Sequence, residues 1–310
     1  MSTGLMRLVA AVLAITAPLF AGGALAADKP RGTAVDPAYQ QAFEKWKAEL
    51  VEDLKENWLP LAGLFWLKPD TNTFGTDPAN DIVLPNRSAP ARVGSFEFQG
   101  GDVTVNFLPD AHATIAGKPV TTAKLQPDTS GDRTVVELGG LRMHVIARGQ
   151  RMGIRVKDLN SLAVRNYPGP VFFPLDPAYR ITAMWVASGG KKTVDVPNVL
   201  GDVTPTPVAG EVRFKIDGQE VRLTDLGGDP SKGLFFVFSD LTSKKDTYPG
   251  GRFLQTDPVA NGTVVLDFNR AYSPPCAVTP YATCPLAPKE NRLSVAIPAG
   301  EKYERTHGHH

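Results

Sequence analysis

Apolar and polar residues alternate with a period of two along much of the chain that follows Leu61. Alternation of this kind is typical of strands that bury one face of a sheet. Asp217-Gly218, between the runs Val212–Ile216 and Glu220–Leu223, is a strong hairpin signal, because both turn residues tolerate positive φ. The 29 glycines and 27 prolines follow no fixed period and supply many turns. We therefore expect a mainly β fold of antiparallel sandwich-like or barrel-like sheets.

One amphipathic helix is expected ahead of these strands. Asp36 can cap its free amide groups, and Pro37 lacks an N–H at a position where none is needed. Apolar residues then recur at spacings of three and four, the pattern of one helix face. They are Tyr39, Phe43, Trp46, Leu50 and Leu54. Pro60 ends the pattern.

The first 26 residues resemble a secretory signal peptide. Leu8–Phe20 forms an apolar core after the lone Arg7, and Ala24-Leu25-Ala26 fits the small-x-small cleavage rule. The apolar run is shorter than the about 20 residues of a membrane-spanning helix. We expect a periplasmic or secreted protein with no integral membrane segment after cleavage, and a retained N-terminal anchor is the alternative.

The remaining chain is expected to divide into consecutive parts. Three strands separated by glycine-containing turns, Thr134–Leu138, Leu141–Ala147 and Met152–Lys157, predict an antiparallel meander. The expected order is a helix region (27–60), an N-terminal β-sandwich-like part (61–128), a C-terminal β domain (129–305) and a disordered tail (306–310).

Charge and missing motifs exclude several classes of function. The chain has 33 Lys and Arg against 32 Asp and Glu, so nothing favours a nucleic-acid partner. It lacks a G-x-S-x-G nucleophile turn, a phosphate loop, a dinucleotide-binding G-x-G-x-x-G after a strand, and H-E-x-x-H. We expect neither a cofactor nor a metal, and the oligomeric state stays open.

The two cysteines, Cys276 and Cys284, are eight positions apart. In an oxidising compartment such a pair predicts a disulfide. Closing this loop would stabilise the fold by roughly 2–3 kcal/mol. Free thiols and a metal site are the alternatives, although a structural zinc site needs four ligands.

The densest mixture of Arg, Asp, Asn, Tyr and Glu lies between residues 247 and 304. Asp267, on the predicted strand Thr263–Phe268, and Asn269 should project from one face. Arginines beside carboxylates either hold a planar anion or pair internally. The candidate ligand-binding residues are Tyr248, Arg252, Asn269, Arg270, Tyr272, Asn291 and Arg292. A short strand, Leu293–Ile297, is expected to follow.

Parts of this stretch resemble a known family. GRFL, DFNRAYSPPC, a second CP, and ENRL followed by AGE resemble the signature of the prokaryotic domain of unknown function 1684. The resemblance extends from Trp46 to Glu301 and implies a shared fold and site, with no established activity. Leu67–Leu125 resembles the opening strands of a forkhead-associated (FHA) β-sandwich. That family reads phosphothreonine through an Arg after its first glycine, whereas Thr76 follows Gly75 here.

Three functions fit these residues. The leading hypothesis is an exported protein that binds a small polar ligand, anionic or sugar-like, in a pocket of the C-terminal β domain. The alternative is an envelope or extracellular hydrolase with Asp267 and Glu290 as its catalytic acid and base. The third is a structural or interaction module without a pocket.

Overall fold

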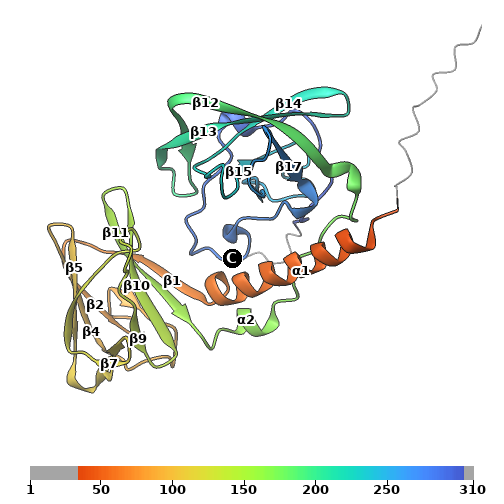
Figure 1. The fold of residues 1–310 in the computed structure, drawn as a ribbon. Helices are drawn as coiled ribbons and strands as arrows, with labels where there is room; N and C mark the ends of the chain where they lie inside the picture. Colours follow the sequence, from red (N-terminus) through yellow and green to blue (C-terminus); the bar gives the residue numbers. More distant parts are fainter. Residues whose placement is uncertain (1–33, 304–310) are drawn as a thin grey trace, which may run out of the picture.

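The computed structural model describes residues 34–303, which form two β-rich units and a long helix, α1 (Figure 1). The expected signal peptide and the expected tail at 306–310 lie outside these residues. Within the described range, no helix combines the length and the apolar character needed to cross a membrane. The mainly antiparallel β fold with one N-terminal helix is confirmed.

Helix α1 spans Pro37–Asp53 and begins as the sequence predicts, because Oδ1 of Asp36 accepts the N–H of Ala38 at 3.0 Å. A π-helical turn, η1 (Leu54–Trp58), continues it toward the first strand. The ring of Phe43 packs edge-on against Phe172 with centroids 5.5 Å apart. The apolar face of α1 therefore packs on the second β unit, along which the helix lies (Figure 1).

The first β unit is a sandwich of a six-stranded sheet, in the order β1-β11-β10-β9-β6-β7, and a five-stranded sheet, β3-β2-β4-β5-β8. One apolar cluster, which includes Phe74, Phe96 and Ile154, draws on both sheets. The strands are β1 (Leu61–Trp66), β2 (Asp70–Gly75), β3 (Ile82–Val83), β4 (Gly94–Gln99), β5 (Asp102–Phe107), β6 (Thr114–Ile115), β7 (Lys118–Pro119), β8 (Thr122–Leu125), β9 (Val136–Leu138), β10 (Leu141–Arg148) and β11 (Arg151–Asp158), and a 3₁₀ turn, η2, spans Pro109–Ala111.

The sheets divide the chain at a different point from the one expected at residues 128 and 129. The predicted meander forms as β9, β10 and β11, but β11 also pairs antiparallel with β1, with Leu61 opposite Lys157. This pairing joins residues far apart in sequence, so the first unit extends to Asp158. The spacing of turns along the chain gives no indication that β1 pairs with β11.

The second β unit holds a four-stranded sheet, β14-β13-β12-β17, and a two-stranded sheet, β15-β16. The predicted hairpin is confirmed: Asp217 and Gly218 turn β13 into β14 with φ of 49° and 77°. The elements are α2 (Leu162–Asn166), η3 (Pro177–Tyr179), β12 (Arg180–Pro197), β13 (Val203–Ile216), β14 (Gln219–Thr224), β15 (Phe235–Phe238), β16 (Arg252–Gln255), β17 (Thr263–Asp267), η4 (Phe268–Arg270), η5 (Pro275–Ala277) and η6 (Lys289–Asn291).

The segment Leu293–Ile297 is not the strand that we expect from the sequence. It runs as irregular backbone beside the chain that leaves β15. The amide of Leu293 donates to the carbonyl of Ser239 at 2.7 Å, and the amide of Leu241 donates to the carbonyl of Val295 at 2.9 Å. These two bonds satisfy only part of the backbone, which is too little for a sheet.

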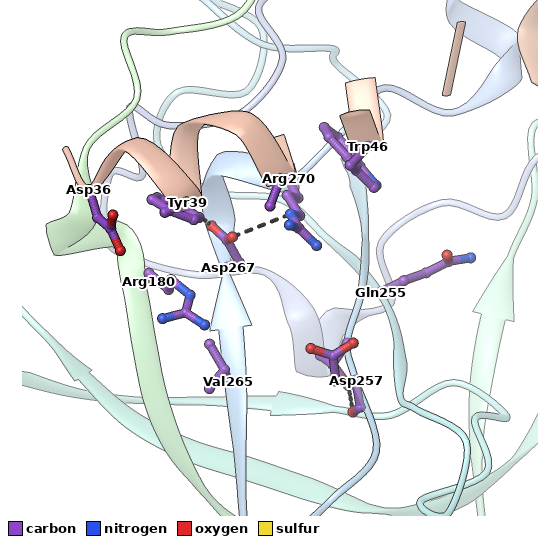
Figure 2. Close-up of a pocket in the computed structure, with 11 residues that line it drawn as sticks. Asp36, Tyr39, Trp46, Arg180, Gln255, Asp257, Val265, Asp267 and Arg270 are labelled. Carbon is purple, nitrogen blue, oxygen red and sulfur yellow. Dashed lines mark hydrogen bonds and ion pairs between the residues drawn. The ribbon is translucent and has the colours of Figure 1, made fainter. Parts of the chain in front are cut away.

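The four-stranded sheet has one buried face and one outer face. Val212, Leu223 and Leu266 point inward to the apolar core. On the outer face, β12 and β17 place Arg180 opposite Asp267, and Thr182 opposite Val265. The N-terminal part of α1 covers the end of this face that carries Arg180 and Asp267 (Figure 2).

Candidate functional site

A pocket of about 440 Å³ lies where α1 crosses the outer face of β12 and β17 (Figure 2). The helix contributes Tyr39 and Trp46, and β12 contributes Arg180. The end of β16 and the loop after it contribute Gln255 and Asp257. The pocket is therefore built from segments that are far apart in the sequence. Its remaining lining residues are Asp36, Ala42, Thr256, Val265, Asp267 and Arg270.

Asp267 lies at the centre of one wall and is 8% exposed. Its Oδ1 accepts a 2.8 Å hydrogen bond from the hydroxyl of Tyr39 and a 3.2 Å bond from Nδ2 of Asn269. Its Oδ2 lies 3.5 Å from Nε of Arg270. Burial, together with the hydrogen bond to Asp267, raises the pKa of Tyr39, so this hydroxyl stays protonated. Asp267 thus has three polar contacts, with Tyr39, Asn269 and Arg270.

The end of β17 explains why Asp267, Asn269 and Arg270 gather there. The strand stops at Asp267, and the 3₁₀ turn η4 follows at once. This turn directs Asn269 back toward the chain before β12, where its Oδ1 accepts the amide of Asp176 at 3.0 Å. The neighbours predicted from strand alternation do lie together, although a turn places them.

Two arginines line the pocket: Arg180 has no ion pair among the described residues, and Arg270 is paired with Asp267. Arg180 is exposed, and its guanidinium lies 5.4 Å from the ring centroid of Tyr39. Among the described residues it makes no hydrogen bond and no ion pair. Arg270 has its single ion pair with Asp267 and lies 6.0 Å from the ring centroid of Trp46. Its buried Nε makes no hydrogen bond within this part of the chain.

The opposite side of the pocket is acidic and polar. The carboxylate of Asp257 is exposed and has no partner among the residues that the structure describes. Asp36 also lines the pocket, although its Oδ1 already caps α1. Figure 2 shows Asp257 and Gln255 across the pocket from Asp267. A ligand here would meet cations on one side and hydrogen-bond acceptors on the other.

The pocket continues along the sheet into a second, shallower hollow of about 990 Å³. Val265 lines the first hollow, and its cross-strand partner Thr182 lines the second. The second hollow then passes Met184 and Arg222, both exposed. The two hollows therefore lie next to each other on one sheet face.

Arg252 and Asn291, two of the candidate ligand-binding residues, lie in the interior. Nη2 of Arg252 pairs with Oδ2 of Asp240 at 2.7 Å, and the guanidinium also donates to the carbonyls of Ile297 and Ala299. Asn291 is fully buried and bonds both backbone groups of Thr224. Neither residue lines the pocket. Both hold segments of the second unit together.

The other candidates are spread around the unit. Tyr272 packs behind the pocket, with its ring 6.3 Å from that of Trp46. Tyr248 stacks edge-on with Tyr303 at 5.0 Å, and Arg292 is exposed elsewhere. Glu290, proposed with Asp267 as a catalytic pair, is also absent from the pocket lining. Of the candidates, only Asp267 and Arg270 line the pocket, with Asn269 and Tyr272 behind it.

Sequence reasoning missed most of the residues that line the pocket, among them Tyr39, Trp46, Arg180 and Asp257. Tyr39 and Trp46 fit the apolar spacing of the helix, which predicts a packing role and gives no sign that they also line a pocket. Arg180 reaches the site because it pairs in register with Asp267. The register between these two strands, whose paired residues are 87 positions apart, has no signal in a single sequence.

Cys276 and Cys284 are free cysteines in the structure, so the expected disulfide is not formed here. The two residues are nonetheless adjacent. The amide of Cys276 donates to Sγ of Cys284 at 3.2 Å, and the amide of Cys284 donates to Sγ of Cys276 at 3.3 Å. Each sulfur is thereby an acceptor for the other residue's backbone. Within the described range, no group of three or more His, Cys, Asp or Glu side chains is placed to hold a metal ion.

Comparison with known proteins identifies the C-terminal part. Residues 165–302 match the model of the family DUF1684, described as a protein of unknown function. The resemblance is confirmed. The match covers less of the chain than the expected span from Trp46 to Glu301. It includes Arg180, Asp267 and Arg270 of the pocket and leaves out Tyr39 and Trp46.

Solved structures give further similarities. An uncharacterized protein of Haloarcula marismortui is 31% identical, with a TM-score of 0.39, over 46% of this chain and 80% of that one. An FHA domain from a study of phosphothreonine-dependent interactions is 18% identical, with a TM-score of 0.22, over 30% of this chain and 92% of that one. The FHA domain of FhaA, in complex with an intracellular domain, has the same identity and TM-score and is covered to 97%. Among curated proteins, none matches this chain.

Proposed function

We propose that the pocket between α1 and the outer sheet face binds a small polar ligand through an anionic group held by Arg180 and Arg270. The observation that carries this proposal is the guanidinium of Arg180, which lines the pocket and has no ion pair among the described residues. A planar guanidinium matches the geometry of a carboxylate or phosphate and can bond it at two points.

Asp267 supports the proposal by orienting the second arginine. Its carboxylate contacts Nε of Arg270, while Tyr39 and Asn269 occupy its Oδ1. The charges of Asp267 and Arg270 offset each other, so the net positive charge of this wall comes from Arg180. The terminal nitrogens of Arg270 stay available for a ligand.

The rest of the pocket favours a sugar-like body for this ligand. Trp46 offers an aromatic wall, and sugar rings have apolar faces that pack on aromatic rings. Asp257 and Gln255 on the other side can accept or donate hydrogen bonds to hydroxyl groups. The proposed ligand is therefore a sugar acid or a sugar phosphate.

The alternatives receive less support. A hydrolase that uses Asp267 with Glu290 needs both carboxylates at one pocket, and only Asp267 lines it. An interaction module without a pocket leaves the unpaired arginine inside a hollow unexplained. We retain the proposals that the protein carries a signal peptide and is periplasmic or secreted, and that its cysteines form a disulfide after export.

The test is ligand-dependent stabilisation. Galacturonic acid, glucose 6-phosphate and inorganic phosphate are titrated into the protein during thermal unfolding, with neutral glucose as the reference. A ligand at a hundred times its Kd should stabilise the folded state by about 2.7 kcal/mol. Arg180→Gln and Arg270→Gln should each remove most of the shift, whereas Arg292→Gln, an exposed arginine outside the pocket, should keep it. If the anionic probes stabilise no more than glucose does, or if Arg180→Gln keeps the full shift, the proposal is wrong.

A further inference from the structure

Arg155, on β11 of the first unit, is a buried cation without a carboxylate partner. Arg155 is 7% exposed and forms no ion pair with any of the described residues. Its Nε is buried and makes no hydrogen bond. The contacts that remain are one 3.4 Å bond to the carbonyl of Tyr281 and the ring of Trp58 at 6.0 Å. Burying a charge this way is costly unless an anion lies nearby.

The segment that Arg155 contacts is the one between the two cysteines. Tyr281, whose carbonyl accepts the bond, lies between Cys276 and Cys284 in the chain. Cys276 is partly accessible, and Cys284 is buried. Each cysteine amide points at the other sulfur, so the two side chains meet side by side. A thiolate here would be the missing counter-charge for Arg155.

The other charged and titratable groups around the pair do not take this role. Arg148, on the neighbouring strand, is neutralised by Asp128, with Nη1 and Oδ2 2.8 Å apart. Tyr248 approaches through its hydroxyl, which donates to the carbonyl of Cys276 at 3.4 Å. Its pKa is raised, chiefly by burial, so it is uncharged and contributes no anion. Asp128 also favours the charged form of Arg155, more strongly than the cysteines do, but forms no ion pair with it among the described residues. Arg155 is therefore the cation near the pair that has no ion pair of its own.

The two thiols differ in acidity. The hydrogen bond from Cys284, helped by the Cys284 amide and by the charge of Arg155, lowers the pKa of the Cys276 thiol, although burial opposes this. The same hydrogen bond and burial raise the pKa of Cys284. The accessible sulfur is thus the one that ionises first, which is the arrangement of an attacking thiolate and a second, resolving thiol.

We propose that Cys276 and Cys284 form a redox-active dithiol that exchanges with a small disulfide, with Arg155 stabilising the attacking thiolate. The Cys276 thiolate attacks one sulfur of glutathione disulfide and displaces one glutathione thiolate. Cys284 loses its proton, attacks the Cys276 sulfur and displaces the second glutathione. Two protein thiols are oxidised and one glutathione disulfide is reduced to two thiols. The proposal is independent of the ligand pocket.

A change in the oxidation state of the two cysteines would affect a contact between the two β units. The same segment contacts the first β unit through Thr283, whose Oγ1 accepts a 3.1 Å hydrogen bond from Nε of Arg148. Tyr281 adds the bond from Arg155. The oxidation state of the cysteines therefore acts on a segment that joins the two units.

Two measurements test the proposal. The first is the rate at which iodoacetamide alkylates each cysteine of the reduced protein, followed by fragment-ion mass spectrometry from pH 5 to 10. Cys276 should react first and well below the pH at which an ordinary thiol ionises. Arg155→Gln should slow this reaction at pH 7 about tenfold, as expected for a rise of one pKa unit. Arg155→Lys, which keeps the charge, and Arg222→Gln, at an exposed arginine on β14 of the second unit, should stay close to the wild type.

The second measurement needs no variant. The protein is equilibrated with mixtures of reduced glutathione and glutathione disulfide, and the loss of two hydrogens is followed by intact mass. A redox-active pair should pass from thiols to disulfide within the range of these mixtures. A pair that stays oxidised in the most reducing mixture, or reduced in the most oxidising one, overturns the proposal. So does a Cys276 profile that matches an ordinary thiol, or one that Arg155→Gln leaves unchanged in a folded protein.

Discussion

The hydroxyl of Tyr39 donates a 2.8 Å hydrogen bond to Oδ1 of Asp267 and thereby joins α1 to the end of β17 across 228 positions of the chain. The same hydroxyl accepts a 3.1 Å bond from Nδ2 of Asn269. The helix is thus attached to the sheet at the pocket itself. The bond fixes both the wall of the pocket and the orientation of its central carboxylate.

Replacing Tyr39 with phenylalanine should destabilise the protein by about 1 kcal/mol, the net contribution of such a hydrogen bond. The change removes only the hydroxyl and leaves the ring in place. Urea unfolding measures the free energy of unfolding. Tyr179→Phe is the control, because its half-buried hydroxyl makes no hydrogen bond in the described part of the chain. Equal losses in the two variants would contradict the structural role of the Tyr39 bond.

Arg252→Met should destabilise the protein by about 3–5 kcal/mol, because it leaves the buried carboxylate of Asp240 without its counter-charge. Both side chains of the pair are at most 1% exposed, so water cannot replace the lost partner. The free energy of unfolding is again the measurement. Arg292→Met, at an exposed position, should change it by less than about 0.5 kcal/mol. A similar small change for Arg252→Met would show that the interior tolerates the unpaired carboxylate.

Asn291→Ala should cost at least about 2 kcal/mol, because it leaves buried backbone groups unsatisfied. The side chain accepts the amide of Thr224 at 2.8 Å and donates to the carbonyls of Thr224 and Val237. Hydrogen exchange measures the effect at a single amide: the Thr224 N–H should exchange faster in the variant than in the wild type. Unchanged protection of that amide in a folded variant would mean that another acceptor has replaced Asn291.

Glu301 should make the stability depend on pH. Burial raises its pKa to about 7, although the amide and hydroxyl of Ser273 and the charge of Arg252 act in the opposite direction. The folded state therefore binds this proton more tightly than the unfolded state, whose carboxyl has a pKa of about 4.3. The stabilisation is complete below about pH 4.3 and is lost as the pH rises through about 7.

Glu301→Gln removes this dependence. The variant should be more stable than the wild type at pH 8, by an amount of the order of 3 kcal/mol, and nearly equal to it at pH 4. Urea unfolding from pH 4 to pH 8 measures the difference. Glu220→Gln, whose side chain is 86% exposed, should show no such trend. Parallel pH profiles for the wild type and Glu301→Gln would assign the buried proton to another group.

Most of the fold that the sequence predicts follows from local patterns. The cap at Asp36, the apolar spacing that follows it and the Asp217-Gly218 turn act over a few residues, so a single sequence displays them. The pairing of β1 with β11 and of β12 with β17 joins distant segments. For that reason the boundary between the β units and the position of Arg180 could not be predicted.

For the candidate site, too, the sequence predicts the local features but not those that depend on long-range packing. The predicted strand Thr263–Phe268 and the polar residues after it include Asp267 and Arg270, both of which line the pocket. Composition could not separate Arg270, which lines the pocket, from Arg252, which is buried with Asp240. Both arginines stand close to aromatic residues in the same polar stretch of the chain. The difference between them is burial, which depends on the whole packed unit.

The family match includes the sheet wall of the pocket and omits the helix wall, so the two walls come from different segments of the chain. Arg180, Asp267 and Arg270 belong to the matched segment, whereas Tyr39 and Trp46 arrive with a helix that precedes another β unit. Because Tyr39 bonds Asp267 and the ring of Trp46 lies 6.0 Å from Arg270, a substitution in the helix acts on the sheet wall as well as on the opening of the pocket. A protein that held the matched segment without this helix would keep the arginines but lack one wall of the pocket.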